Sequence, residues 1–291
     1  MNSSHPQWDL NRLAELFRQA GMIALDYFEA PPAELKSDAT VVTIADKTIE
    51  QLFAEKLDDP ANDSFMIGEE TIGKYSSEYV RKALQSPCCW VLDPIDGTAP
   101  YSSHMDFWGI SLGLMQEGKL VEGAVYLPRF DKLIATCKDK IVWKPLQTPA
   151  DWAEFELASN PLGIAGHISL GQMPTRKWGY SGKNALFSIC SCVGSLYLLL
   201  TGKVIAYCGD FKLWDIAGML PILERAKYPI FSVNGNNEPL SGDLKDDMFE
   251  LDAVPTMWKV KAPVIAAPDK TTALELLKKF YFVEQPAEPD K

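Results

Sequence analysis

The chain has 291 residues, 47% of them hydrophobic and 23% charged, and its formal net charge is -11. This composition is that of a globular protein and excludes a disordered or fibrous chain, and the length suits one large domain or two lobes sharing a core. The negative charge argues against nucleic acid or an anionic membrane as the main partner, since both select basic faces.

The sequence predicts no secretory signal, no membrane span and no C-x-x-C motif. The N-terminal stretch lacks a positive region followed by an apolar one, so no secretory signal is predicted. The longest apolar run, near residues 195–208, is broken by Gly202 and Lys203 and is too short to span a bilayer. None of the six cysteines forms a C-x-x-C motif. We therefore expect a cytoplasmic protein with reduced thiols.

In the first half of the chain, hydrophobic periodicity and turn residues predict helices and strands in alternation. The predicted elements are a helix over 8–30 that Pro31 ends, a strand from 41 that turns helical after Asp46, a strand over 88–93, a hairpin over 108–128 with its turn at Glu117 and Gly118, and further extended structure over 131–137.

The second half begins with a stretch rich in Pro, Gly and Ser, residues 144–182, which predicts a connection between lobes. After it we expect helical or mixed structure over 184–202, a buried strand over 203–208 and a helix over 215–226. The polar tail from about residue 284 is predicted to fray.

One stretch, WVLDPIDGTAPY at 90–101, combines two aspartates with a glycine behind an apolar run. Pro94 disfavours helix at Asp93, so Asp93 is predicted to end the strand with its carboxylate at the tip. Gly97 permits a tight turn, and Thr98 is predicted to cap the helix that follows. Free N–H groups beside two carboxylates favour an anion only when cations neutralise those carboxylates. The pattern therefore predicts a metal-dependent phosphate site.

Three other interpretations of this stretch were weighed. Aspartate-nucleophile phosphatases use D-x-D-G-T, in which the acids are two apart, whereas Asp93 and Asp96 are three apart. An EF-hand loop needs acids at alternate positions and a glutamate at the twelfth, which this stretch does not supply. An ordinary acidic junction between strand and turn would be the simplest interpretation if the stretch stood alone.

Three further acidic stretches accompany it: KSDATVVTIAD at 36–46, SFMIGEET at 64–71 and KLWDIAG at 212–218. With these four stretches in this order, the sequence resembles the inositol monophosphatase family of lithium-sensitive, magnesium-dependent phosphatases. The resemblance covers roughly residues 10–226. The superfamily also contains fructose-1,6-bisphosphatases, bisphosphate nucleotidases and a branch of histidinol-phosphate phosphatases.

The resemblance implies a set of site residues, each at a position that matches a family motif. The implied metal ligands are Glu69, Asp93, the Ile95 carbonyl, Asp96 and Asp215. The implied catalytic residues are Glu69, Thr98, Asp46 and Lys36, of which Thr98 and Asp46 accompany the nucleophilic water. The implied substrate-binding residues are Gly97, Thr98, Asp96, Ser195 and Asp210. Hard oxygen ligands of this kind suit two or three Mg²⁺ ions, with Mn²⁺ as a substitute.

The resemblance also implies the architecture and the activity. The expected fold is a layered α/β sandwich, with an antiparallel sheet lobe carrying helices over residues 1–145 and a smaller mixed α/β lobe over 146–291. The expected protein is a homodimer that hydrolyses a small alcohol or sugar-type phosphate and binds neither nucleic acid nor membrane.

The sequence departs from the family on the substrate side. Many inositol monophosphatases carry a glutamate shortly before the W-D pair, whereas YCGDFKLWD offers Asp210 or Lys212. Leu196 and Tyr197 replace small residues after the G-S pair. The alternatives left open are therefore histidinol phosphate, inositol 1-phosphate or a bisphosphate nucleotide as substrate, or a regulatory member that binds metal or a sugar phosphate without turnover.

Overall fold

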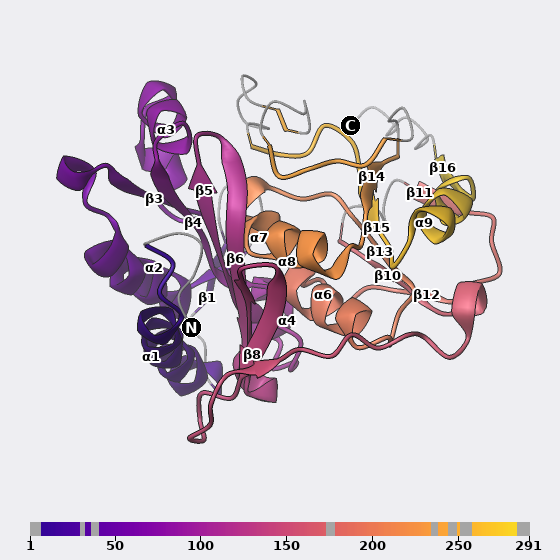
Figure 1. The fold of residues 1–291 in the computed structure, drawn as a ribbon, viewed down its shortest axis with the longest axis horizontal. Helices are drawn as coiled ribbons and strands as arrows, with labels where there is room; N and C mark the ends of the chain where they lie inside the picture. The colour runs from indigo at the N-terminus through magenta and orange to yellow at the C-terminus, as the bar shows by residue number, and fades with distance from the viewer. Residues whose placement is uncertain are drawn as a thin grey trace, which may run out of the picture.

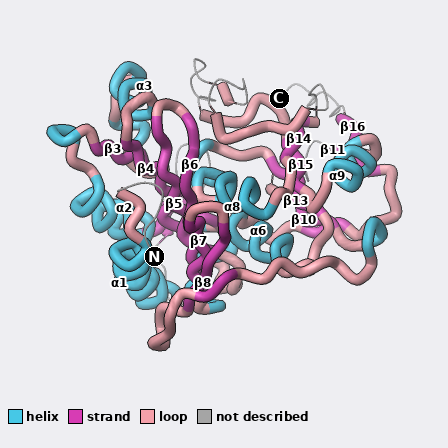
Figure 2. Tube along the Cα trace, in the orientation of Figure 1, coloured by secondary structure: helices cyan, strands magenta, loops and turns pink. Residues whose placement is uncertain are grey.

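The structure is a computed structural model that describes residues 7–29, 33–35, 41–172, 178–233, 238–243, 249–250 and 258–283. Two sheets and their helices form successive layers (Figure 1). Helices α1 and α2 cover one face of the larger sheet, α6, α7 and α8 lie between the sheets, and α9 packs on the smaller sheet. Figure 2 shows the helical layer that separates the two groups of strands. The expected α/β layered fold is thus confirmed.

The larger sheet has seven strands in the order β3-β4-β5-β6-β7-β8-β9, and it is mostly antiparallel because only β3 and β4 run parallel. All nine residues of β4 are buried, which fits its apolar sequence. Glu117 and Gly118 join β5 to β6 with positive φ at both positions, as the predicted hairpin turn requires. The strands are β3 (Ser64–Gly68), β4 (Cys88–Asp96), β5 (Gly109–Gln116), β6 (Lys119–Leu127), β7 (Lys132–Cys137), β8 (Lys140–Lys144) and β9 (Ala153–Glu154).

The smaller sheet has five strands in the order β12-β10-β13-β15-β14 and is mixed, with β10 parallel to both of its neighbours. Its strands are β10 (Ile168–Leu170), β12 (Leu186–Phe187), β13 (Ala206–Gly209), β14 (Ile230–Ser232) and β15 (Val264–Ala266). Two further antiparallel pairs are β1 (Ala33–Leu35) with β2 (Val41–Thr43), and β11 (Trp178–Tyr180) with β16 (Phe280–Phe282).

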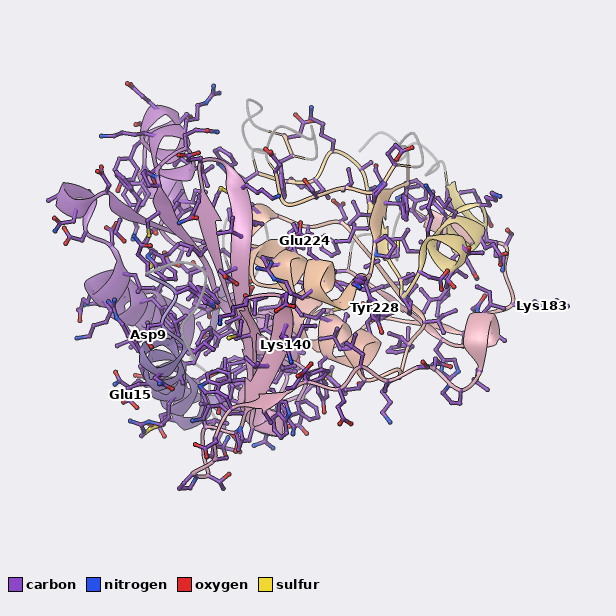
Figure 3. The ribbon with its side chains drawn as sticks, viewed as in Figure 1. Asp9, Glu15, Lys140, Lys183, Glu224 and Tyr228 are labelled. Carbon is purple, nitrogen blue, oxygen red and sulfur yellow. The ribbon has the colours of Figure 1, made fainter. Side chains whose placement is uncertain are left out.

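The helices begin where polar side chains satisfy their first N–H groups. Asp9, at the start of α1 (Figure 3), accepts hydrogen bonds from the N–H groups of Asn11 and Arg12. The helices are α1 (Leu10–Phe28), α2 (Ile44–Leu57), α3 (Ser77–Leu84), α4 (Thr98–Ser102), α6 (Cys192–Leu200), α7 (Leu213–Ala217), α8 (Met219–Ala226) and α9 (Lys270–Leu277), and short 3-10 turns occur at Pro60–Asn62, Ile72–Lys74, Pro128–Phe130 and Gly163–Ala165. Within the described ranges, none of the helices has the length and hydrophobicity that a bilayer crossing requires.

The junction between α7 and α8 lies directly on the larger sheet. A Cβ at Gly123 in β6 would lie 2.2 Å from the carbonyl oxygen of Gly218, so only glycine allows this close approach. The N–H of Gly218 also donates to the hydroxyl of Ser111 in β5. These contacts fix α7, and therefore Asp215, against the strands that carry the other acids.

Several predicted boundaries in the first lobe were wrong. Strand β4 continues through Asp96 instead of ending at Asp93, because an irregular register between these two residues accommodates Pro94 outside the ladder. Helix α2 begins before Asp46, because Thr43 and Asp46 cap each other's backbone at its start. Thr98 is the first residue of α4, and Gly97 occupies the capping position.

The second lobe also differs from the expected pattern. The predicted helix over 215–226 is two helices, because Pro221 cannot donate to the carbonyl of Ala217 and the chain breaks at Gly218. The stretch over 144–182 contains β9, β10 and β11 as well as loops. The predicted boundary at residue 145 falls within the larger sheet, because β9 still pairs with β8.

Candidate active site

A cavity of about 390 Å³ lies where β4, the loop before α6 and the turn between β13 and α7 meet. It brings together side chains from motifs that are distant in the sequence. The predicted site residues that line it are Glu69, Asp93, Ile95, Asp96, Gly97, Thr98, Asp210 and Asp215. All five predicted metal ligands therefore face one space.

Asp93 is the most constrained of these acids. It is 2% exposed, and its Oδ1 has no hydrogen-bond partner. Burial raises its pKa well above the ordinary value, and the negative charges of Glu69, Asp96 and Asp215 raise it further. A buried carboxylate oxygen without a partner is costly unless a proton or a cation satisfies it.

Asp96 is tied to the beginning of α6. Its Oδ1 accepts from the N–H of Cys192 at 2.9 Å, and its Oδ2 accepts from the N–H of Val193 at 2.8 Å and from the hydroxyl of Ser191. Burial raises its pKa to about 6, although these hydrogen bonds lower it. A carboxylate offers about four acceptor positions. The N–H groups of Cys192 and Val193 and the hydroxyl of Ser191 use three of them, and only one of these three bonds is to Oδ1, the oxygen that is therefore more open to a cation.

Asp215 and Glu69 face the cavity from opposite lobes. Asp215 lies in the first turn of α7, where its Oδ2 accepts from the N–H of Lys212 at 2.8 Å. Burial and the charge of Glu69 raise the pKa of Asp215 to about 7. Glu69 follows β3, and its N–H donates to the carbonyl of Leu92 in β4. The parallel pairing of β3 and β4 thus sets Glu69 beside the end of β4.

The donor set suits a hard divalent cation. Among the described residues, no group of three acidic, histidine or cysteine side chains has the arrangement of a preformed metal site. Burial raises the pKa of each aspartate in the cluster, and in the absence of a cation the repulsion of neighbouring negative charges raises the pKa of Asp93 and Asp215 further. Asp93 Oδ1, without a partner, and the remaining position on Asp96 Oδ1 are the oxygens that such a cation would use.

Gly97 and Thr98 form the turn that follows these acids. Gly97 has a φ of 85°, and a Cβ there would lie 2.8 Å from the Cβ of Ser191. Both the conformation and the space therefore require glycine. The hydroxyl of Thr98 donates to the carbonyl of Ile95 at 3.1 Å, which keeps the turn closed over β4.

Helix α2 supplies two buried acids behind the cavity. Asp46 accepts from the N–H and the hydroxyl of Thr43, and Glu50 accepts from the N–H of Glu70 at 2.8 Å. One oxygen of each has no hydrogen-bond partner. Burial raises the pKa of each to about 7, and the charges of Glu70 and Glu69 add to the effect. Sequence reasoning missed Glu50, although its spacing of four from Asp46 places both on one helical face.

One predicted substrate-binding residue, Ser195, does not line the cavity. Ser195 is fully buried in α6, where its hydroxyl lies 2.9 Å from that of Ser169 in β10 and donates to the carbonyl of Ser191. Lys36 lies outside the described residues.

Ser191 and Lys259 are among the cavity residues that the sequence did not predict. Ser191 follows a recognisable pattern, a serine directly before a helical run, and it does cap α6 by accepting from the N–H of Gly194. Lys259 carries no local signal, because it reaches the cavity only through its pairing with Lys212.

Comparison with known proteins agrees with this geometry. The inositol monophosphatase family matches residues 10–282. The chain is 24% identical over 251 residues to a histidinol-phosphatase of Chlorobaculum parvum, which covers 81% of this chain and 90% of that protein.

Solved structures share the fold. A staphylococcal inositol monophosphatase-1 soaked in 100 mM LiCl aligns with a TM-score of 0.66 and 17% identity over 92% of each chain. An IMPase/NADP phosphatase complexed with Mg²⁺ and phosphate aligns with a TM-score of 0.64 and 18% identity over 92% of this chain and 93% of that one. Because the family match extends over both lobes, the chain belongs to the inositol monophosphatase family and is a phosphoric monoester hydrolase.

Proposed function

We propose that this protein is a Mg²⁺-dependent phosphatase whose ions are held by Glu69, Asp93, the Ile95 carbonyl, Asp96 and Asp215. The observation that carries the proposal is the buried Oδ1 of Asp93, which has no hydrogen-bond partner and lies among three other carboxylates. Two or three Mg²⁺ ions, or Mn²⁺ in their place, would polarise the phosphate ester and lower the pKa of a water.

The chain's own groups would orient the reactants. The N–H groups of Gly97 and Thr98 border the cavity beside Asp96, where they can donate to phosphate oxygens. Thr98 and Asp46 would hold the attacking water, with Asp46 accepting its proton, and Lys36 would assist them. A raised pKa suits Asp46 to this role, because a base works best when its pKa lies near the operating pH.

The substrate is a small phosphate ester of the alcohol or sugar type. The resemblance would give inositol a glutamate partner shortly before the W-D pair, whereas here Asp210 and Lys212 occupy this wall. A site lacking the partner of a substrate hydroxyl discriminates poorly in favour of that substrate. We therefore propose that myo-inositol 1-phosphate is not the best substrate, and that a non-cyclitol phosphomonoester exceeds it about tenfold in kcat/KM.

A panel of phosphate esters tests this assignment directly. Phosphate release is measured at near-neutral pH with Mg²⁺ and with EDTA, using inositol, histidinol, sugar and nucleotide phosphates. Mg²⁺-dependent release from at least one compound is expected, with inositol 1-phosphate below another. No release from any compound would contradict the proposal. The homodimer and the cytoplasmic location remain predictions, and light scattering tests the first.

A further inference from the structure

Two lysines stand side by side on one wall of the cavity. Lys212, before α7, and Lys259 are partners in an antiparallel bridge. The flanking hydrogen bonds run from Leu213 N–H to the Trp258 carbonyl and from Val260 N–H to the Phe211 carbonyl. The lysines are therefore a non-hydrogen-bonded pair, the arrangement in which opposite side chains lie closest. Both line the cavity that also holds Asp93 and Gly97.

This arrangement is unfavourable without a ligand. Like charges directly opposite each other on paired strands are destabilising. The residue before Lys259, Trp258, has a φ of 70°, a conformation that a bulky side chain rarely adopts, and its ring is fixed by burial. Strain of this kind is held in place by the surrounding structure and clusters at functional sites.

The acids of the cavity do not balance both lysines once the proposed metal ligands are engaged. Lys259 Nζ lies 3.2 Å from Asp210 Oδ2, while Lys212 Nζ lies 4.0 Å from Glu69 Oε1. Five acids line the cavity. Four of them, Glu69, Asp93, Asp96 and Asp215, are the proposed metal ligands, and the fifth is Asp210. Among the acids that the structure describes around the cavity, Asp210 then remains opposite two ammonium groups, which leaves one positive charge on the described part of this wall.

We propose that the substrate carries a second anionic group, a carboxylate or a second phosphate, which Lys212 and Lys259 bind. The inference rests on the proposed function, because it assumes that the phosphate ester itself occupies the metal side of the cavity. An anion between the two lysines removes their repulsion and makes charge-assisted hydrogen bonds to both. The lysine pair thus selects among phosphate esters by the charge of the alcohol portion.

Matched compounds test this selection. D-3-phosphoglycerate and sn-glycerol 1-phosphate have the same configuration at C2 and differ by a carboxylate in place of a hydroxymethyl group. Adenosine 3′,5′-bisphosphate and adenosine 3′-monophosphate differ by a second phosphate. We expect the wild-type protein to prefer the more anionic member of at least one pair by about tenfold in kcat/KM, and the pair that responds identifies the anion.

Lysine variants assign the preference to this wall. Lys212→Met and Lys259→Met keep most of the side-chain volume and remove the charge, and each should reduce the preference about tenfold. Lys183→Met, which changes an exposed lysine at the outer edge of the second lobe, should leave the preference at the wild-type ratio. If Lys212→Met and Lys259→Met lowered kcat/KM equally for both members of each pair, the proposal would be overturned.

A binding measurement separates this proposal from the phosphatase assignment. Calorimetry with the same pairs, and with Ca²⁺ in place of Mg²⁺, measures affinity without relying on turnover. Tighter binding of the more anionic member, lost in Lys212→Met, supports the lysine pair even if the protein releases no phosphate. Equal affinity for both members of both pairs contradicts the lysine pair even if phosphate is released.

Discussion

The hydroxyl of Ser191 donates a hydrogen bond to the carboxylate of Asp96, although the two residues are 95 positions apart in the chain. Ser191 precedes α6 in the second lobe, and Asp96 ends β4 in the first. The N–H groups of Cys192 and Val193 complete the contact. The start of α6 therefore orients a proposed metal ligand, and the two lobes meet at the reaction site.

Ser191→Ala tests this link. The change removes the hydrogen bond to Asp96 and the cap on the N–H of Gly194, so we expect a loss of about 1–3 kcal/mol in the free energy of unfolding. Urea denaturation measures it. The variant should also need more Mg²⁺ for half-maximal activity. Ser102→Ala, whose hydroxyl donates only to the carbonyl of Ala99, is the matched control and should change neither quantity. An unchanged Mg²⁺ requirement in Ser191→Ala would separate Ser191 from the metal site.

Gly97→Ala tests the turn behind Asp96. Alanine at a φ of 85° is strained, and its Cβ would press on the Cβ of Ser191 and on Pro100. We expect a cost of about 1–3 kcal/mol and a fall in kcat, because the N–H groups of the turn would shift. Gly73→Ala is a matched control, since a Cβ there has no atom within 4 Å. If Gly97→Ala and Gly73→Ala had the same Tm and the same kcat, the turn at Gly97 would not be constrained.

The pH dependence of the metal-free protein follows from the raised carboxyl pKa values. Asp46, Glu50 and Asp215 have pKa values of about 7, and Asp96 of about 6, against ordinary values of 3.8 for aspartate and 4.5 for glutamate. Between the ordinary and the raised pKa values, the folded state therefore binds more protons than the unfolded state. The stability gained from protonating these carboxyl groups is complete below about pH 4 and is lost as the pH rises to about 7.

Thermal unfolding at a series of pH values measures this effect. With EDTA, we expect the Tm to fall by at least about 5 °C between pH 5 and pH 8. Asp46→Asn should show a smaller fall, because one raised carboxyl group is gone. Added Mg²⁺ should raise the Tm more at pH 8 than at pH 5, since protons compete with the cation for the same oxygens. If the Tm of the metal-free protein stayed constant or rose between pH 5 and pH 8, the raised pKa values of the buried carboxyl groups would be contradicted.

Arg225→Met tests a buried ion pair outside the site. Arg225 Nη2 in α8 lies 3.2 Å from Oε2 of Glu122 in β6, and the glutamate side chain is fully buried. Removing the cation leaves a buried charge, so we expect a loss of about 3–5 kcal/mol in the free energy of unfolding. Lys140→Met breaks an exposed pair with Glu154 and should have a much smaller effect. Similar urea midpoints for the two variants would contradict this difference.

The acids that line the candidate site could be marked from the sequence because each motif joins an apolar strand or a helix start to a carboxylate. Asp93 follows a buried apolar run within β4, and Asp215 lies in the first turn of a helix, so local patterns mark both residues. The N–H of Glu69 bonds to the carbonyl of Leu92 only because β3 pairs with β4 in one register. The motifs therefore mark the predicted residues, whereas long-range pairing alone brings them together around one cavity.

Other features that the sequence did not predict depend on tertiary structure. Lys259 lies in a short extended segment whose partner, Lys212, is 47 positions away, and no local pattern marks that bridge. Ser195 was expected at the substrate, but its hydroxyl is directed to Ser169 on a strand of the smaller sheet. The helix breaks at Gly218, where the chain contacts the larger sheet. Helical periodicity alone does not predict this contact.

The most direct test of the account compares phosphate release by the wild-type protein and by Asp93→Asn over a range of Mg²⁺ concentrations. Asp139→Asn, a change at an exposed turn residue, is the control. We expect Mg²⁺-dependent release by the wild-type and control proteins, and at least a ~100-fold loss in Asp93→Asn, because a neutral amide is a poorer ligand at the centre of the site. Near-wild-type turnover by folded Asp93→Asn at saturating Mg²⁺ would contradict the account.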